Sequence, residues 1–339
     1  MMVKKGRRVL FLLKALIAVI RTRFITHRPL LLSHLATSRC NCRCPICLWR
    51  GYSEEELSTD QVLSIYEDAR RNGFAAVVLW GGEPLLRDDI VQIVRGAHEM
   101  GFVTLLITNG YRLEEMAPEL CPNLDALIVS IDFPSEEHDL FRGYPGLFRK
   151  AVRGIYRAKQ VKPKMKISIN CVITKLNGRH VKGMISLADR LGVSIAFESM
   201  NTYMPFSTRN ASSFKLPPEE ESEIFKLIRR YKLRGHRINN SLAYLDTFIG
   251  GKKRYKCHSL EICLTLQPNG DVRICLSRKP LANLVKTPIG EVLKMREYRE
   301  YQRLSHRCHI CNDYGTVEYS HIWNFNPKAL LGAAFTFLT

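Results

Sequence analysis

Between residues 29 and 198, apolar strand-like runs alternate with amphipathic helix-like segments. Three of the helix-like segments end at a glycine, which is common just past a helix C-terminus. Strands and helices in strict alternation predict a parallel sheet with right-handed crossovers. This α/β pattern fits either an open barrel or a doubly wound sheet. The expected strands cover residues 29–37, 74–80, 102–107, 125–131, 165–173 and 193–198, and the expected helices cover residues 59–72, 88–100, 111–119, 146–160 and 177–191.

The pattern changes in the last third of the chain. Residues 219–232 predict one more helix, which is followed by a basic connector. An Asn-Gly-Asp motif at residues 269–271 separates two short apolar runs, residues 264–266 and 272–274, and predicts a β-hairpin. We therefore expect a second, smaller unit after the connector.

Polar residues follow the expected strands at the points where the strands end. In parallel α/β folds, ligands bind at the carboxyl ends of the strands. Each polar residue alone has an ordinary interpretation as part of a turn or as a helix cap, but the complete set in register favours a binding site. The set comprises the segments 40–47, 81–83 and 108–110 and the residues Ser130, Asp132, Asn170 and Glu198.

Three cysteines, Cys40, Cys44 and Cys47, follow the first expected strand in a C-x-x-x-C-x-x-C spacing. Such a loop can present three thiolates to one iron–sulfur cluster, and because four thiolates are needed to close a cluster, one iron stays without a protein ligand. The alternative is a zinc knuckle, which usually takes paired C-x-x-C units. Cys42 does not fit the three-plus-two spacing, and we predict that it is not a ligand.

The second motif, Gly81-Gly82-Glu83, follows a buried-looking apolar run. The glycines permit close approach of the backbone to a ligand, and the glutamate charge suits an ammonium group. Together with the cysteine loop, this motif closely resembles the radical S-adenosylmethionine (radical SAM) enzymes. The resemblance implies that the cysteine loop binds a [4Fe-4S] cluster whose open iron chelates the methionine part of SAM, and that Gly81, Gly82 and Glu83 hold its amino group. One departure is Ile46, where the family usually has an aromatic residue.

Further residues extend this resemblance. The segment 130–132, followed by His138-Asp139 and Arg142-Gly143, resembles radical SAM enzymes that carry an extra cluster domain. The resemblance implies that Ser130, Asp132 and Asn170 line the site for the ribose and carboxylate of SAM or for the substrate. The cofactor-binding set that we predict is Gly81, Gly82, Glu83, Asn109, Ser130, Asp132 and Asn170.

A second group of cysteines surrounds the expected hairpin and closely resembles the Twitch domain, a truncated SPASM domain. The resemblance implies one auxiliary [4Fe-4S] cluster. Cys263 competes with Cys257, but it lies too close to the hairpin for the pattern. A zinc ribbon is the alternative for four cysteines in two groups, and Cys121 and Cys171 are expected to be ordinary buried thiols. The predicted ligands are Cys257, Cys275, Cys308 and Cys311.

The resemblance covers roughly residues 29–315 and implies a partial (β/α)6 TIM-like barrel with a small C-terminal iron–sulfur (Twitch) domain. We expect four segments along the chain. They are a basic amphipathic helix over residues 1–28, the radical SAM partial barrel over 29–235, the Twitch domain over 236–320 and an apolar tail over 321–339.

Composition adds a compartment and a surface property. The 46% apolar content excludes disorder, and eleven cysteines without a disulfide-like framework suit a reducing cytosol. The formal charge of +19 comes from residues spread along the chain. Residues 9–20 are mostly apolar between basic flanks and too short to cross a bilayer, which needs about 20 residues. This start fits either a helix in the membrane interface or a helix that caps the barrel. Since both ends of the chain are apolar, we expect a cytoplasmic enzyme that is peripheral on the inner membrane face.

The resemblance implies that a flavodoxin- or ferredoxin-type donor reduces the cluster, that SAM is split into methionine and a 5′-deoxyadenosyl radical, and that this radical removes hydrogen from a substrate carbon. The two apolar ends favour a membrane-associated lipid or isoprenoid substrate. A peptide is the next candidate, and RNA is not favoured because no RNA-binding appendage is present. An electron-transfer protein without SAM is the non-enzyme alternative, and the 81–83 motif argues against it.

Overall fold

The computed structural model describes residues 20, 22–202, 211–250, 255–273, 275 and 279–338. Within them, one nine-stranded sheet has the order β6-β5-β4-β3-β2-β1-β7-β8-β9. Strands β1 to β7 run parallel in this sheet, and β8 and β9 are antiparallel additions at one edge. The strands are β1 Leu31–Thr37, β2 Ala76–Gly81, β3 Val103–Thr108, β4 Ala126–Ser130, β5 Lys166–Ile173, β6 Ser194–Ser199, β7 Cys263–Leu266, β8 Asp271–Arg273 and β9 Ala282–Asn283.

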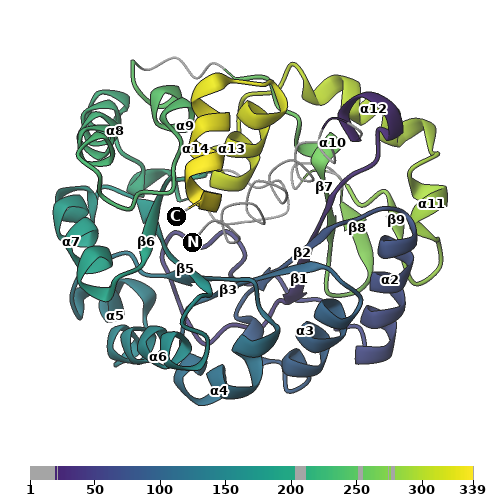
Figure 1. Cartoon of the computed structure of the whole chain (residues 1–339), viewed down its shortest axis with the longest axis horizontal. Coiled ribbons are helices and arrows are strands. Elements are labelled where there is room, and N and C mark those ends of the chain that lie inside the picture. Colours follow the sequence, from purple (N-terminus) through teal and green to yellow (C-terminus); the bar gives the residue numbers. More distant parts are fainter. Residues whose placement is uncertain are drawn as a thin grey trace, which may run out of the picture.

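The sheet curves into an arc with helices along its outer side (Figure 1). The strand–helix alternation explains this arrangement, because each crossover must cover the apolar face of the strands that it joins. The crossover helices are α2 Thr59–Arg71, α3 Ile90–Glu99, α4 Leu113–Leu120, α5 Glu137–Arg142, α6 Leu147–Val161 and α7 Val181–Leu191. The later helices are α8 Pro218–Leu233, α9 Leu242–Thr247, α10 Ser259–Ile262, α11 Ile289–Val292, α12 Arg296–Ser305, α13 Tyr314–Trp323 and α14 Pro327–Leu338.

Local sequence explains where helix α2 begins and ends. The side chain of Ser58 accepts a hydrogen bond from the Gln61 amide at 3.2 Å, and the Gln61 side chain accepts one from the Ser58 amide at 2.9 Å. This capping box satisfies two amide groups that the first helical turn leaves unpaired. At the other end, Gly73 adopts a φ of 94°, a left-handed conformation that glycine tolerates best.

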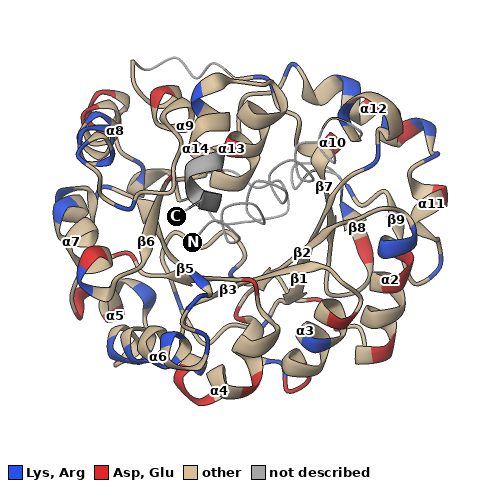
Figure 2. Cartoon of the chain, in the orientation of Figure 1, with Lys and Arg blue, Asp and Glu red and all other residues tan. Residues whose placement is uncertain are grey.

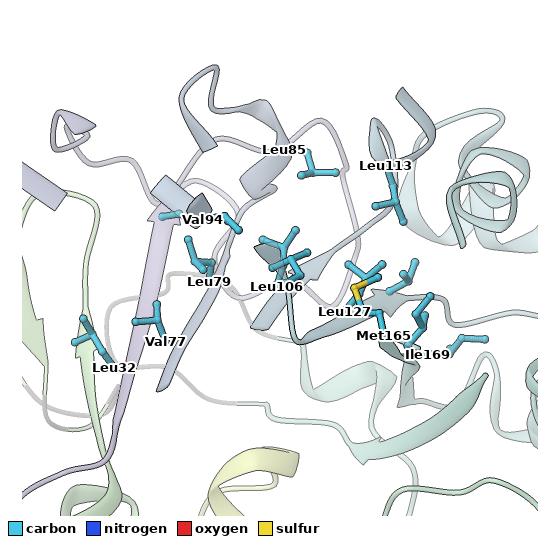
Figure 3. Packing of buried hydrophobic residues seen from close by; sticks show 14 of the residues in the cluster. Leu32, Val77, Leu79, Leu85, Val94, Leu106, Leu113, Leu127, Met165 and Ile169 are labelled. Carbon is cyan, nitrogen blue, oxygen red and sulfur yellow. The ribbon is translucent and has the colours of Figure 1, made fainter. Parts of the chain in front are cut away.

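The core lies between the strands and the outer helices. Figure 3 shows Leu32 beside Val77 and Leu79 beside Leu106 on neighbouring strands, and all four are fully buried. Burying such a side chain contributes roughly 1.5–3 kcal/mol. This continuous packing fixes the register of the strands and therefore the positions of the residues at their carboxyl ends.

The C-terminal hairpin does not form a sheet of its own. Strand β7 hydrogen-bonds in parallel with β1, with Leu31 opposite Cys263 and His34 opposite Leu266. The predicted hairpin of β7 and β8 therefore continues the barrel sheet. Among the described residues, β6 and β9 are the two edges of this sheet, and they do not pair with each other.

The predicted elements of the barrel are present with ends that shift by a few residues. The largest shift is at the helix expected from residue 177, which starts as α7 at Val181 because Gly178–His180 is a 3-10 turn. The short helices α5 and α9 to α14 were not predicted. Helix α13 crosses the boundary between the expected Twitch domain and the expected tail, and α14 lies within the tail. Both helices lie beside α9 (Figure 1), and a Cβ on Gly332 would come within 2.9 Å of Ser241 Cβ.

The predicted N-terminal helix falls almost wholly outside the described residues. Thr22–Thr26 forms a short π-helical turn. None of the helices in the part of the chain that the structure describes is long and apolar enough to cross a membrane. On the outer helices, basic and acidic side chains are interspersed, and α6 is largely basic (Figure 2).

Candidate functional site

The cysteine loop leaves β1 and is braced by the backbones of two neighbouring segments. The amides of Gly82 and Glu83 donate to the carbonyl oxygens of Thr37 and Arg39, each at 2.8 Å. On the other side, the Arg43 amide donates to the carbonyl oxygen of Arg142 at 2.7 Å. These bonds fix both the start and the middle of the loop.

The two glycines of the second motif permit this close approach. A Cβ built on Gly81 would lie 2.4 Å from the Thr37 carbonyl oxygen, and one on Gly82 would lie 2.1 Å from the Arg39 carbonyl oxygen. Any side chain would push the cysteine loop away from β2. The sequence analysis expected the glycines to approach a ligand, and the structure shows that they approach the base of the cysteine loop.

Glu83 is fully buried, and protein donors satisfy its carboxylate. Thr108 Oγ1 donates to Oε1 at 2.6 Å, the Leu85 amide donates to Oε1 at 3.0 Å, and the Asn109 amide donates to Oε2 at 2.6 Å. Burial raises the pKa of Glu83, and these hydrogen bonds oppose the rise. The side chain thus ties the ends of β2 and β3 together, and its predicted contact with an ammonium group stays a prediction.

Asn109 connects β3 to the cysteine loop. Its Nδ2 donates to Asn41 Oδ1 at 2.8 Å and to Cys42 Sγ at 3.3 Å, while its Oδ1 accepts from the Tyr111 amide at 2.9 Å. The Nδ2 of this buried side chain therefore holds the cysteine loop in place, while its Oδ1 fixes the turn that follows β3.

The cysteine thiols of the loop lie together. The Cys42 thiol hydrogen-bonds to the sulfur atoms of Cys40 and Cys44, and this bond lowers the pKa of Cys44 to about 6, with further help from the Arg142 charge. Burial raises the pKa of Cys47, and the charges of Cys44 and Cys40 add to the rise. Thiolates are the ligands that iron–sulfur clusters take. The three predicted ligands thus fit such a cluster, and the Cys42 thiol lies among them.

Asp132 forms a buried ion pair that also supports the loop. Its Oδ2 accepts from Arg142 Nε at 2.7 Å and lies 2.6 Å from Nη2, and its Oδ1 accepts from the Val172 amide at 3.1 Å. The same Arg142 offers its carbonyl oxygen to the loop. The predicted ligand-binding role of Asp132 stays a prediction, while its structural role is visible.

The ends of β5 and β6 carry the remaining polar residues. Ser130 lies opposite Asn170 in the β4–β5 register, and Asn170 Nδ2 donates to Glu198 Oε2 at 3.3 Å. Burial raises the pKa of Glu198 to about 8, and the negative charge of Asp313 contributes to the rise. Asp313 caps α13 by accepting from the Thr316 amide at 2.7 Å. The sequence analysis missed Asp313, although it lies two positions after a predicted cluster ligand.

The second cysteine group also converges. Burial raises the pKa of Cys257 to about 11, and the charges of Cys308 and Cys275 contribute. Burial also raises the pKa of Cys311, where Cys275, Cys257 and Cys308 all contribute. Cys263 lies in β7 instead, where burial raises the pKa of its thiol to about 12 and the charge of Asp313 adds to the rise. The four predicted ligands therefore lie near enough to influence one another's charge, and the iron–sulfur cluster or zinc ion that they would hold stays a prediction.

Comparison with known proteins identifies the barrel. Residues 35–188 match a family model described as the Radical SAM superfamily. The chain is 34% identical over 179 residues to an AdoMet-dependent heme synthase from Methanosarcina barkeri. The aligned region covers 50% of this chain and 49% of the relative. It is 32% identical over 164 residues to a probable GTP 3′,8-cyclase from Saccharolobus solfataricus, with 47% and 52% covered. The chain thus spans about half the length of the curated relatives that it matches.

Solved structures match over more of the chain. Streptococcus suis SuiB bound to its precursor peptide SuiA matches with a TM-score of 0.68, 15% identity, and coverage of 84% of this chain and 69% of that one. The structure of anSMEcpe with bound AdoMet matches with a TM-score of 0.67, 20% identity, and coverage of 90% of this chain and 99% of that one. These likenesses confirm the predicted α/β partial-barrel fold and decide against the doubly wound sheet.

Proposed function

We propose that this chain is a radical SAM enzyme, because residues 35–188 match the Radical SAM superfamily model, and that it cleaves SAM reductively and uses a second cluster in the later steps of turnover. The observation that carries the proposal is the braced three-cysteine loop above the ends of β1 and β2. When bound, a [4Fe-4S] cluster and SAM supply a 5′-deoxyadenosyl radical, which removes hydrogen from a substrate carbon.

The residues of this chain have assignable roles in that reaction. Cys40, Cys44 and Cys47 hold the cluster that binds SAM, and the backbone of residues 81–83 holds the loop against β2. Glu198 lies near the end of β6 and Asn170 lies level with the end of β4, at the side of the sheet where a parallel barrel binds its ligand. We assign Ser130 to the same ligand. Cys257, Cys275, Cys308 and Cys311 hold the auxiliary [4Fe-4S] cluster.

The test is 5′-deoxyadenosine release by anaerobically reconstituted protein with dithionite or reduced flavodoxin. We expect release by the wild-type protein and loss to the protein-free level in Cys47→Ala. Iron content and the optical absorption of the cluster are measured on the same samples. Undiminished 5′-deoxyadenosine release by Cys47→Ala would refute the assignment of the loop.

A peptide is the substrate that the described site supports best. Charged and amide side chains surround the ends of β4 to β6, among them Asp132, Asn170, Glu198 and Asp313. Such groups hydrogen-bond to peptide amides and are poorly matched to an isoprenoid chain. The likeness to peptide-bound SuiB also supports a peptide. The names of the sequence relatives imply chemically different substrates, so the similarity of the barrel does not identify the substrate of this chain.

A membrane lipid or isoprenoid is the second candidate, and residues 1–28 are the observation that favours it. The two are separated by adding either total lipid extract or a peptide fraction from the source cells to the cleavage assay. Stimulation by peptides alone supports the first candidate, and stimulation by lipid alone supports the second. Deleting residues 1–28 tests the membrane contact, because the truncated protein should bind anionic vesicles more weakly than the full chain.

A further inference from the structure

A separate cluster of metal-ligating side chains lies where α10, α12 and α13 meet. His258 precedes α10, Glu261 lies within it, and His306 follows α12. One ligand atom from each of the three lies within 4.8 Å of the other two. Glu261 Oε1 is the centre of the group, at 3.1 Å from His258 Nδ1 and in direct contact with His306 Nε2.

The tautomer of His258 follows from its neighbour Asn324. Asn324 Nδ2 donates to the carbonyl oxygens of Lys256 and Ser320, at 3.1 and 2.9 Å. The amide oxygen must therefore face His258, whose Nε2 lies 2.9 Å from Asn324 Oδ1. Since that oxygen only accepts, Nε2 carries a proton, and Nδ1 is the ring nitrogen that faces Glu261.

The Nδ1 atom of His258 is the buried atom of this cluster that lacks a hydrogen-bond partner among the described residues. His258 is fully buried, and Glu261 Oε1 lies 3.1 Å from this Nδ1 atom. A buried ring nitrogen and a carboxylate oxygen this close need either a proton or a metal ion between them. A metal ion would satisfy both atoms, and the Nε2–Asn324 bond is the outer-shell contact that metal-ligating histidines usually make.

The second oxygen of Glu261 is already occupied. Its Oε2 accepts from Trp323 Nε1 at 2.8 Å and lies 3.1 Å from Arg23 Nη1. These contacts orient the carboxylate so that Oε1 faces the two imidazoles. Ligands of a tetrahedral ion at about 2.0–2.1 Å lie roughly 3.3 Å apart, so only small side-chain shifts are needed to admit one.

We propose that His258 Nδ1, Glu261 Oε1 and His306 Nε2 bind one divalent transition-metal ion, with Zn²⁺ as the expected occupant. Two imidazoles and one carboxylate suit zinc and its neighbours in the first transition series. Glu261 and His306 also line a pocket of about 480 Å³ whose other walls include Arg23, Arg299 and Arg303. Three protein ligands leave one coordination position for water or a small anion.

The test uses full-length protein whose cysteines are occupied by reconstituted clusters. One equivalent of Zn²⁺ is added, weakly bound metal is removed with a chelator, and the zinc X-ray absorption spectrum is recorded. We expect about one retained zinc per chain with nitrogen and oxygen neighbours at about 2.0–2.1 Å and the scattering pattern of imidazole. A shell of sulfur at about 2.3 Å would overturn the proposal, because the zinc would then be bound by cysteines.

Variants assign the ligands. His306→Gln and Glu261→Gln should each weaken zinc binding at least about 100-fold, and Asn324→Ala should weaken it about 10- to 100-fold through His258. His98→Gln, the same kind of change at an exposed histidine on α3, should bind zinc like the wild type. Unchanged zinc affinity in both ligand variants would overturn the proposal and leave an ion-pair cluster. If the variants do not fold, the wild-type spectrum alone decides between the imidazole and sulfur shells.

Discussion

The two cysteine sites of this chain differ in how they are assembled. The first takes its three predicted ligands from one loop, residues 40–47. Backbone hydrogen bonds fix the start of this loop to the segment that follows β2 and its middle to the end of α5. The second takes its four predicted ligands from separate segments of the C-terminal part, before and after the β7–β8 hairpin. They are Cys257, Cys275, Cys308 and Cys311. A site built from one loop depends on how closely its neighbours pack. A site built from several segments depends on the fold of the whole C-terminal part.

The largest expected difference between the sites concerns SAM cleavage. Cys44→Ala should abolish 5′-deoxyadenosine release, whereas Cys311→Ala should preserve release in the absence of substrate and abolish product formation. Each variant should lose about half of the iron of the reconstituted protein, because each site would hold one four-iron cluster. Cys263→Ala changes a thiol that belongs to neither set of predicted ligands, so this variant should keep the iron of both clusters and the release of 5′-deoxyadenosine. Loss of SAM cleavage in Cys311→Ala with retention in Cys44→Ala would reverse the assignment.

The brace between α5 and the first site should be the next most sensitive feature. Asp132→Asn leaves the Arg142 guanidinium without its carboxylate partner, and breaking one side of a buried pair costs about 3–5 kcal/mol. We expect a fall of that size in the free energy of unfolding, measured by urea denaturation, together with weaker cluster retention. Glu136→Gln breaks the exposed pair with Arg149 and should cost less than about 1 kcal/mol. Equal effects in the two variants would refute a special role for the brace.

The same contrast explains what the sequence could predict. The barrel elements follow from periodicity, and the first site follows from spacing within one loop. The hydrogen bonds of Glu83 with Thr108 and with the Asn109 amide depend on how strands β2 and β3 pair, which periodicity does not encode. The proximity of Glu198 and Asp313 likewise depends on where α13 packs. Short helices such as α9 and α11 have too few turns for a periodic signal, so the C-terminal part was predicted only through its cysteines and its hairpin.

The packing of the first site can be tested with one added methyl group. Gly82→Ala would place a Cβ 2.1 Å from the Arg39 carbonyl oxygen, so the cysteine loop must move. We expect a loss of about 1–3 kcal/mol in stability and a reduced iron content, since overpacking costs this much in well-packed interiors. Gly315→Ala is the matched control, because its Cβ would find its nearest neighbour at an ordinary 3.5 Å. A Gly82→Ala protein with wild-type iron and stability would show that the loop tolerates displacement.

The last predicted effect depends on pH and concerns the place where the two regions meet. Glu198 at the end of β6 has a pKa of about 8, raised from 4.5 by burial and by Asp313, which follows the second cysteine group. Between these two pH values the folded state binds the proton and the unfolded state does not. Stability should therefore fall as pH rises from about 4.5 to about 8, by at most about 1.4 kcal/mol per pH unit.

Glu198→Gln removes this titration and keeps the size of the side chain. The stability of this variant relative to the wild type should therefore increase as pH rises from 5 to about 8.5, in urea denaturation curves recorded across that range. Glu297→Gln, at an exposed position on α12, should give a curve parallel to that of the wild type. Buried Glu318 also has a raised pKa, of about 7, and its titration lowers stability with rising pH in the same way. Because all of these proteins contain Glu318, its contribution cancels when their curves are compared. Parallel curves for Glu198→Gln and the wild type would mean that burial and Asp313 do not raise the pKa of Glu198 in the folded protein.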